Sequence, residues 1–138
     1  MKKFDNYKSN LSVLVHADSQ DTGNEFIIGG IIDKFFIQFE LAWKVLKELL
    51  AYEGIAAAQS GSPREIIKEA YKCYPFIDEK IWLSMLSERN NLAHIYDQKA
   101  AERLVQRIIG EYISAFVELE KNISKKYPDL LDKTEING

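Results

Sequence analysis

The stretch FFIQFELAWKVLKELL, residues 35–50, decides the fold because its apolar side chains cover more than one face of a helix. A helix that is apolar around so much of its circumference lies at the centre of a bundle, or it also faces another chain. We expect this helix to run from about residue 25 to 53 and to stop at Gly54, a residue type favoured just after a helix end. The pair Gly29-Gly30 is expected either to bend this helix or to mark a turn before it.

Other segments on both sides of this stretch also show helical periodicity. The first is expected over residues 3–17. The next opens with SGSPREIIKEA, in which Ser62 suits the N-cap, Pro63 the first helical position and Glu65 the third. The remaining two are expected to begin after caps at Asp78 and Asp97, the earlier running through Tyr96 and the later to about residue 124. The sequence shows no convincing alternating strand, so it predicts an all-α, up-and-down antiparallel bundle of four to five helices.

The chain of 138 residues fits a single domain. Within residues 1–138 we expect a first helix and loop over 1–24, the bundle core over 25–124 and a frayed tail over 125–138. The formal net charge of −3 gives no global positive field that would attract nucleic acid or an anionic membrane. If the protein binds RNA, a local cationic patch must do so.

The cysteine content and the apolar runs predict a cytoplasmic protein. Cys73 is the only cysteine, so no disulfide forms within the chain, and we expect this residue to be a buried small side chain. The opening MKKFDNYKSN turns polar where a signal peptide needs its apolar core. The longest apolar run, FIIGGII, is far shorter than the roughly 20 residues that span a bilayer, so no membrane association is expected.

The stretch RNNLAHIYD, residues 89–97, places an arginine where a leucine is expected. If the helix is continuous, Arg89 lies on one strip with apolar side chains above and below it: Trp82, Leu86, Ala93 and Tyr96. One interpretation is structural: the guanidinium reaches solvent or pairs with an acid such as Glu40 or Glu48. The other is that the stretch belongs to an anion-binding site.

The residue types in this stretch suit phosphodiester chemistry. Arginine neutralises phosphate charge, and histidine exchanges protons near neutral pH. Asn90 lies one helical turn before His94 and can orient either the imidazole or the substrate. Arg89 and His94 are five residues apart, about 140° around a continuous helix, so they share a site only if the arginine swings round or a symmetric partner adds a second pair.

RNNLAHIY resembles the Arg-x4-His-x-Tyr signature of the HEPN superfamily, and specifically the small HepT-like proteins, which are also called nucleotidyltransferase substrate-binding proteins. The resemblance is carried by three blocks in order: FFIQFELAWKVLKELL, SPREIIKEAYK and WLSMLSERNNLAHIYD. It implies a helical bundle that dimerises and brings two motifs into one composite cleft. It further implies a two-gene system of toxin–antitoxin type with a small nucleotidyltransferase encoded nearby.

Active members of this family are metal-independent endoribonucleases that use no cofactor. By this resemblance His94 is the acid/base group at the ribose 2′-hydroxyl, Arg89 stabilises the pentacoordinate phosphorane, and Asn90 assists. Tyr96 would receive AMP from the partner, and the added negative charge would keep RNA phosphate out of the cleft.

Two other functions fit the sequence. In the first, the protein would be a non-catalytic substrate-binding subunit that docks onto a separate nucleotidyltransferase. This function suits its acidic charge and needs no chemistry from His94. Alternatively, it is a structural helical adaptor, which leaves Arg89 unexplained.

Several other residues are expected to have structural or surface roles. His16 suits a helix cap or the surface, and Trp43 and Trp82 suit the core. Two histidines far apart, with no cluster at ligand spacing, argue against a metal site. Six basic residues either line the surface along which RNA approaches or form solvated helix faces. A solvated face is the more common role for such residues. The six are Lys68, Lys72, Lys80, Lys99, Arg103 and Arg107.

Overall fold

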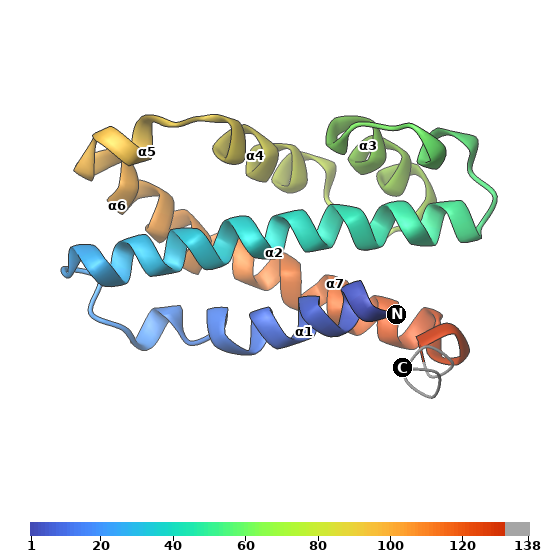
Figure 1. Cartoon of the computed structure of the whole chain (residues 1–138), viewed down its shortest axis with the longest axis horizontal. Helices are drawn as coiled ribbons and strands as arrows, with labels where there is room; N and C mark the ends of the chain where they lie inside the picture. Colours follow the sequence, from blue (N-terminus) through green and yellow to red (C-terminus); the bar gives the residue numbers. More distant parts are fainter. Residues whose placement is uncertain (132–138) are drawn as a thin grey trace.

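The computed structural model describes residues 1–131, which form helices joined by short turns with no strand in that range. The α-helices are α1 (Lys2–Leu14), α2 (Glu25–Tyr52), α3 (Pro63–Cys73), α4 (Glu79–Asn90), α5 (Ala93–Tyr96), α6 (Gln98–Arg107) and α7 (Ile113–Lys126). Two 3-10 turns, η1 (Ala17–Ser19) and η2 (Ala56–Gln59), and a π-helical segment, η3 (Ile108–Tyr112), lie between them. The predicted all-α bundle is confirmed (Figure 1).

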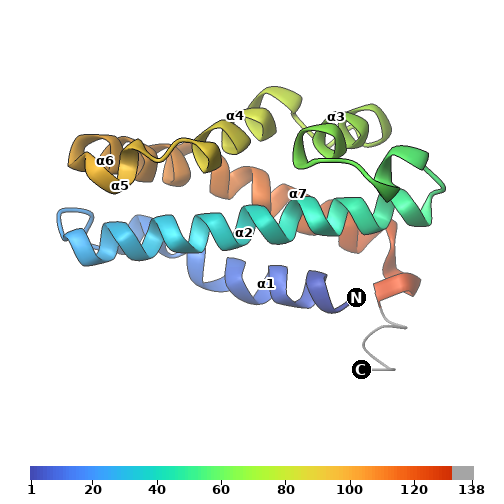
Figure 2. The ribbon, with the colours of Figure 1, turned by 45° about the horizontal axis from the view of Figure 1, so that its top comes forward.

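Helix α2 is the central element of the bundle, as its apolar circumference predicts. It lies between α1 on one side and α3 and α4 on the other (Figures 1 and 2). Aromatic rings from distant segments meet on it: the ring centroid of Phe35 is 5.3 Å from that of Tyr112 and 6.1 Å from that of Phe116. Each such fully buried ring contributes about 1.5–3 kcal/mol through the apolar surface it removes from water.

A buried polar pair fixes how α1 lies against α2. The side-chain amide of Asn10 donates to Gln38 Oε1 at 2.7 Å and to the carbonyl of Lys34 at 2.9 Å. Gln38 in turn donates to the carbonyl of Tyr7 at 2.9 Å, and the Tyr7 hydroxyl donates to the carbonyl of Phe116 at 2.6 Å. Because buried amides are costly to leave unpaired, these bonds select one register of α1 on α2 and α7.

The helix starts follow the caps expected from the sequence. Ser62 Oγ accepts from the amide of Glu65, Asp78 Oδ1 from Ile81, and Asp97 Oδ1 from Lys99 and Ala100. Asn24 caps α2 in the same way. Each such cap contributes about 1 kcal/mol to helix stability.

The glycines predicted to end or to interrupt α2 behave differently. Gly54 has φ +80°, the left-handed conformation that ends α2 as predicted. Gly29 and Gly30 lie within α2, which continues through them, so the pair does not mark a turn before the helix. No atoms lie within 4 Å of where a Cβ would stand at either position, so both glycines face open space.

Two helix predictions are wrong in their boundaries, and a third helix has an interruption that was not predicted. The first helix ends at Leu14, not at residue 17, and a 3-10 turn follows it. The fourth helix ends at Asn90 instead of running through Tyr96. The last helical stretch is divided by the π-helical segment between α6 and α7.

Two further differences concern the end of the chain and its cysteine. Cys73 is exposed, contrary to the expected burial, because it occupies the last residue of α3 on its outer side. In the predicted tail, Tyr127 and Leu131 are buried, and residues 132–138 lie outside the described residues. In the described part of the chain, no helix is both long enough and apolar enough to cross a membrane.

Candidate active site

The motif is divided between two helices. Arg89 and Asn90 are the last residues of α4, whereas His94 and Tyr96 lie in the short α5. Asn91 separates them: its backbone is extended, with φ −95° and ψ 116°, and its Oδ1 accepts from the amide of Ala93 at 3.0 Å. An asparagine side chain that bonds locally to the backbone competes with helix continuation, which explains the break.

The guanidinium of Arg89 is paired with an acid of α2. Its Nη2 lies 2.7 Å from Glu40 Oε1, and its Nη1 donates to Asn90 Oδ1 at 3.3 Å. Oε1 of Glu40 is buried and accepts no aligned hydrogen bond, so this contact is an attraction between charges. The second carboxylate oxygen accepts from Trp43 Nε1 at 3.0 Å.

The expected pairing of Arg89 with Glu40 or Glu48 is therefore found, with Glu40 as the partner. Glu48 pairs instead with Lys3. The side chain of Arg89 is only 35% exposed. It does not lie in the middle of an apolar strip, because α4 ends at Asn90 and so Ala93 and Tyr96 do not continue the strip beyond it.

His94 contacts α2, the helix with which Arg89 also pairs. Its ring centroid is 5.1 Å from that of Phe36, which lies one turn before Glu40 on α2. The arginine and the imidazole are thus held by neighbouring turns of one helix face. In residues 1–131 neither ring nitrogen of His94 has a hydrogen-bond partner, so both are available for proton exchange with a ligand.

Tyr96 lies on the surface of α5 and is 86% exposed. Leu92 and Ile95, which the continuous helix placed among apolar neighbours, are exposed at 58% and 60%. The turn at Asn91 causes this difference, because it rotates the side chains that follow away from the core. The tyrosine hydroxyl is therefore accessible to a modifying enzyme.

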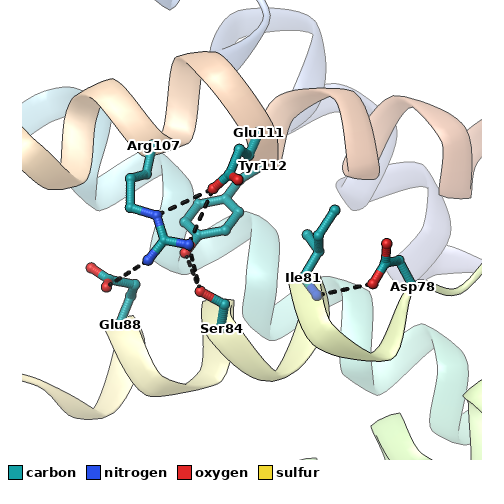
Figure 3. A network of polar contacts seen from close by, with 7 residues as sticks. All are labelled: Asp78, Ile81, Ser84, Glu88, Arg107, Glu111 and Tyr112. Atoms are coloured by element: carbon teal, nitrogen blue, oxygen red, sulfur yellow. Dashed lines mark hydrogen bonds and ion pairs between the residues drawn. The ribbon is translucent and has the colours of Figure 1, made fainter.

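A second polar network braces α4 from the other side (Figure 3). Arg107 Nη2 donates to Ser84 Oγ at 2.8 Å and to Glu111 at 3.1 Å, and its Nη1 lies 3.5 Å from a carboxylate oxygen of Glu88. The Tyr112 and Ser84 hydroxyls share a hydrogen bond at 2.8 Å. The C-terminal half of α4 is thus tied to α6 and η3, as well as to α2 through Arg89.

The charges of this network are mutually stabilised. Partial burial alone would lower the pKa of Arg107, but its hydrogen bonds to Glu111 and the nearby charge of Glu88 raise it overall. Burial also raises the pKa of the Tyr112 hydroxyl, which stays neutral beneath the guanidinium at 5.2 Å. Arg107, one of the basic residues considered for an RNA approach, therefore has a structural role.

One surface hollow borders the motif, and a second contains the residues of α2 that contact it. One, of about 480 Å³, lies between the start of α3 and the end of α4, and its polar lining is formed by Ser62, Arg64, Ser87, Arg89, Asn90 and Asn91. The other, of about 630 Å³, lies between α1 and α2 and includes Val13, Phe36, Ile37 and Glu40. The hollows place Arg64 and Glu40 at the site, two residues to which the sequence analysis gave no functional role.

The sequence contains a signal for the position of Arg64. Two helices joined by a short connection run antiparallel, so the start of the segment at residue 62 must lie beside the end of the segment that contains Arg89. No comparable local signal connects Glu40 with Arg89, which are 49 positions apart.

The other candidate residues stay outside the site. The backbone carbonyl of His16 accepts from Ser19 and Gln20, so this histidine lies at a helix end, as expected, and its side chain is exposed. Trp82 is buried, and Trp43 is partly buried against the core. In the part of the chain that the structure describes, no group of histidine, cysteine and acidic side chains is placed to hold a metal ion.

Comparison with known proteins identifies a family and a relative. The family model described as "Nucleotidyltransferase substrate binding protein like" matches residues 2–125, a range that includes the whole motif. Over 104 residues the chain is 30% identical to a protein of Haemophilus influenzae (strain ATCC 51907 / DSM 11121 / KW20 / Rd) named "Probable ribonuclease HepT". That alignment covers 74% of this chain and 68% of the relative.

Proposed function

Because this chain belongs to the family of HepT-like, nucleotidyltransferase substrate-binding proteins, we propose that it is a metal-independent endoribonuclease silenced by AMP transfer from its partner to Tyr96. The observation that carries this proposal is the pairing of both motif halves with one face of α2. Glu40 holds Arg89, and Phe36, one turn earlier, contacts His94. The break at Asn91 makes this possible, since a continuous helix separates the two side chains by about 140°.

In the proposed reaction the 2′-oxygen of a ribose attacks the adjacent phosphorus, and the bond to the 5′-oxygen breaks. His94 accepts the proton of the 2′-hydroxyl, and an imidazolium supplies a proton to the departing 5′-oxygen. Arg89 neutralises the charge on the non-bridging oxygens through guanidinium N–H groups that Glu40 and Asn90 leave unused. The products are a 2′,3′-cyclic phosphate and a 5′-hydroxyl, so no metal or cofactor is consumed.

The second imidazole of this scheme comes from a second copy of the chain. Val13 and Ile37 are 55% and 47% exposed and line the same hollow as Phe36 and Glu40. Exposed apolar side chains next to the two residues that contact the motif support a homodimer that covers this hollow. Two copies of the motif would then face one cleft.

The proposed regulation depends on the exposure of Tyr96. Its hydroxyl oxygen attacks the α-phosphorus of ATP held by the nucleotidyltransferase, pyrophosphate leaves, and the hydroxyl proton passes to solvent. At 86% exposure this hydroxyl can enter the active site of another protein. The resulting phosphodiester adds negative charge two residues from His94, which disfavours RNA phosphate at the site.

The proposal is tested with purified protein and labelled single-stranded RNA in the presence of EDTA. We expect the unmodified chain to cleave the RNA, and His94→Ala and Arg89→Ala to lower the rate by about a hundredfold or more. His16→Ala is the matched control, because it removes the only other histidine and should leave the rate unchanged. Cleavage by His94→Ala at the unmodified rate would contradict the proposal.

The regulatory part has its own measurement. After incubation with the neighbouring nucleotidyltransferase and ATP, intact-mass analysis should show one added AMP on the unmodified chain and none on Tyr96→Phe. Tyr71→Phe removes the hydroxyl of another exposed tyrosine, on α3, and should not prevent the addition. AMP on Tyr96→Phe would place the acceptor elsewhere.

A non-catalytic docking subunit is the second candidate function, and the Arg89–Glu40 ion pair favours it. In the single chain this acid already neutralises the guanidinium, and the net charge of −3 opposes binding of RNA. This function predicts a stable complex with the nucleotidyltransferase and no RNA cleavage by the chain at any concentration.

A further inference from the structure

We propose that the hollow between α3 and α4, here called the Arg64 hollow, binds a phosphate of the RNA strand next to the one that is cleaved. This inference rests on the proposed ribonuclease function. The hollow is about 480 Å³ in volume and borders the motif directly, since Arg89 and Asn90 form part of its lining. A strand whose scissile phosphate contacts Arg89 therefore places a neighbouring phosphate at or near this hollow.

The lining of the Arg64 hollow is suited to an anion. It combines two guanidinium groups, from Arg64 and Arg89, with the hydroxyls of Ser62 and Ser87 and the amides of Asn90 and Asn91, and it contains no carboxylate. The hollow beside α1 differs, because Glu40 lines it, and the hollow along α6 contains Glu102. In a chain with net charge −3, a local cationic surface of this kind is what RNA binding requires.

Arg64 itself has no competing partner in the structure. It is exposed, and within residues 1–131 no acidic side chain forms an ion pair with it. Arg89 and Arg107 both have such partners. The Arg64 guanidinium is thus available in full to a ligand, whereas Arg89 must share its charge with Glu40.

The start of α3 is held firmly in place beside the hollow. Arg64 is the second residue of the helix, where backbone amides point outward and the helix dipole favours negative charge. The preceding loop is tightly packed: a Cβ at Gly61 would lie 2.7 Å from the carbonyl oxygen of Ala57. This close approach of Gly61 to Ala57 restricts the loop that leads into α3.

The test measures binding of single-stranded 2′-O-methyl RNA, which the proposed reaction cannot cleave because it has no free 2′-hydroxyl. Arg64→Gln should weaken binding about fivefold at about 0.1 M salt and lower the slope of log affinity against log salt by about 0.7. Arg64→Lys should retain most of the affinity, because it keeps the charge. Lys68→Gln, an equal loss of charge one turn along the same helix and outside the hollow, should bind as the unmodified chain does. Thermal unfolding of each variant verifies that it is folded.

Two outcomes would overturn the inference: unchanged affinity and salt slope in Arg64→Gln, or an equal loss of affinity in Lys68→Gln. Cleavage of unmodified RNA by the unmodified chain is measured in parallel. If the chain cleaves RNA and Arg64→Gln binds normally, the inference alone fails; if the chain neither cleaves nor binds RNA, the proposed function fails as well.

Discussion

Arg89 shows how one acidic neighbour determines what a guanidinium at a candidate site can do. Glu40 approaches one of its nitrogens at 2.7 Å, and Asn90 accepts from another at 3.3 Å. Asn90 uses one of the five N–H donors of this rigid plane, and the charge of Glu40 holds the guanidinium beside α2, so further donors are left for a phosphate. We therefore interpret Glu40 as a positioning residue that acts through Arg89.

We predict that Glu40→Gln lowers the rate of RNA cleavage by about tenfold or more, because a misplaced guanidinium stabilises the transition state less well. Affinity for 2′-O-methyl RNA should not fall, since the substitution removes a negative charge from the site. This division between rate and affinity distinguishes positioning from a general loss of structure. Single-turnover cleavage and fluorescence anisotropy measure the two quantities.

The matched control for this prediction is Glu48→Gln, which changes an acid two turns further along α2 that pairs with Lys3. It should alter neither quantity. An unmodified cleavage rate in Glu40→Gln would show that the ion pair has no part in positioning Arg89.

At the scale of elements, the decisive feature is the turn that separates α4 from α5. The turn depends on Asn91, whose side chain bonds to the amide of Ala93 and so replaces a helical hydrogen bond. It brings His94 to Phe36 and exposes Tyr96. A single asparagine thereby affects both the proposed chemistry and the proposed modification.

Asn91→Ala is expected to lower RNA cleavage substantially while changing the free energy of unfolding by only about 1 kcal/mol. Alanine removes the cap and favours the helix, so α4 extends and carries His94 away from Phe36. Asn91→Ser keeps a capping oxygen and should retain most of the activity. Equal activity in the alanine and serine variants would mean that the cap does not govern the position of His94.

Two glycines provide a matched test of how tightly the elements pack. Gly61→Ala should destabilise the fold by about 1–3 kcal/mol, because the new Cβ meets the backbone oxygen of Ala57 at 2.7 Å. Gly30→Ala should stabilise it by about 0.5–1 kcal/mol, because Gly30 lies in α2 with open space around it and alanine favours the helix. Urea unfolding of both variants measures the difference, and equal stabilities would contradict the described packing of the α3 loop.

For the whole molecule, the central question is whether two chains complete one site. A single chain leaves Val13 and Ile37 exposed in the hollow that also contains Phe36 and Glu40, the residues of α2 that contact the motif. Association of two copies over this surface would remove apolar area from water and enclose the cleft. The rate of RNA cleavage should therefore depend on whether the protein is a monomer or a dimer.

We predict that Ile37→Lys converts a dimer into a monomer and abolishes RNA cleavage, because a buried lysine charge opposes association. Tyr71→Lys is the control: Tyr71 is 51% exposed, close to the 47% of Ile37, but it lies on α3 away from the motif hollows. Size-exclusion chromatography with light scattering gives the oligomeric state. A monomeric Ile37→Lys variant with full activity would refute the composite cleft.

The helical class, the central position of α2 and the caps at Ser62, Asp78 and Asp97 follow from the sequence, because periodicity and capping depend on residues within a few positions of one another. Membership of the family likewise follows from motifs that are continuous in the chain. The break at Asn91 was not predicted, although its cause is local. The periodic pattern of apolar residues continued across it and outweighed the signal of one asparagine.

The pairing of Arg89 with Glu40, chosen from two possible acids, and the packing of His94 against Phe36 came only from the tertiary structure. So did the Arg64 hollow, which two helices form together. Each of these contacts joins residues that are distant in the chain, and their distances depend on how α2, α3 and α4 pack. A sequence pattern specifies which face of a helix is buried, but the side chain it meets there is determined by the packing of the whole bundle.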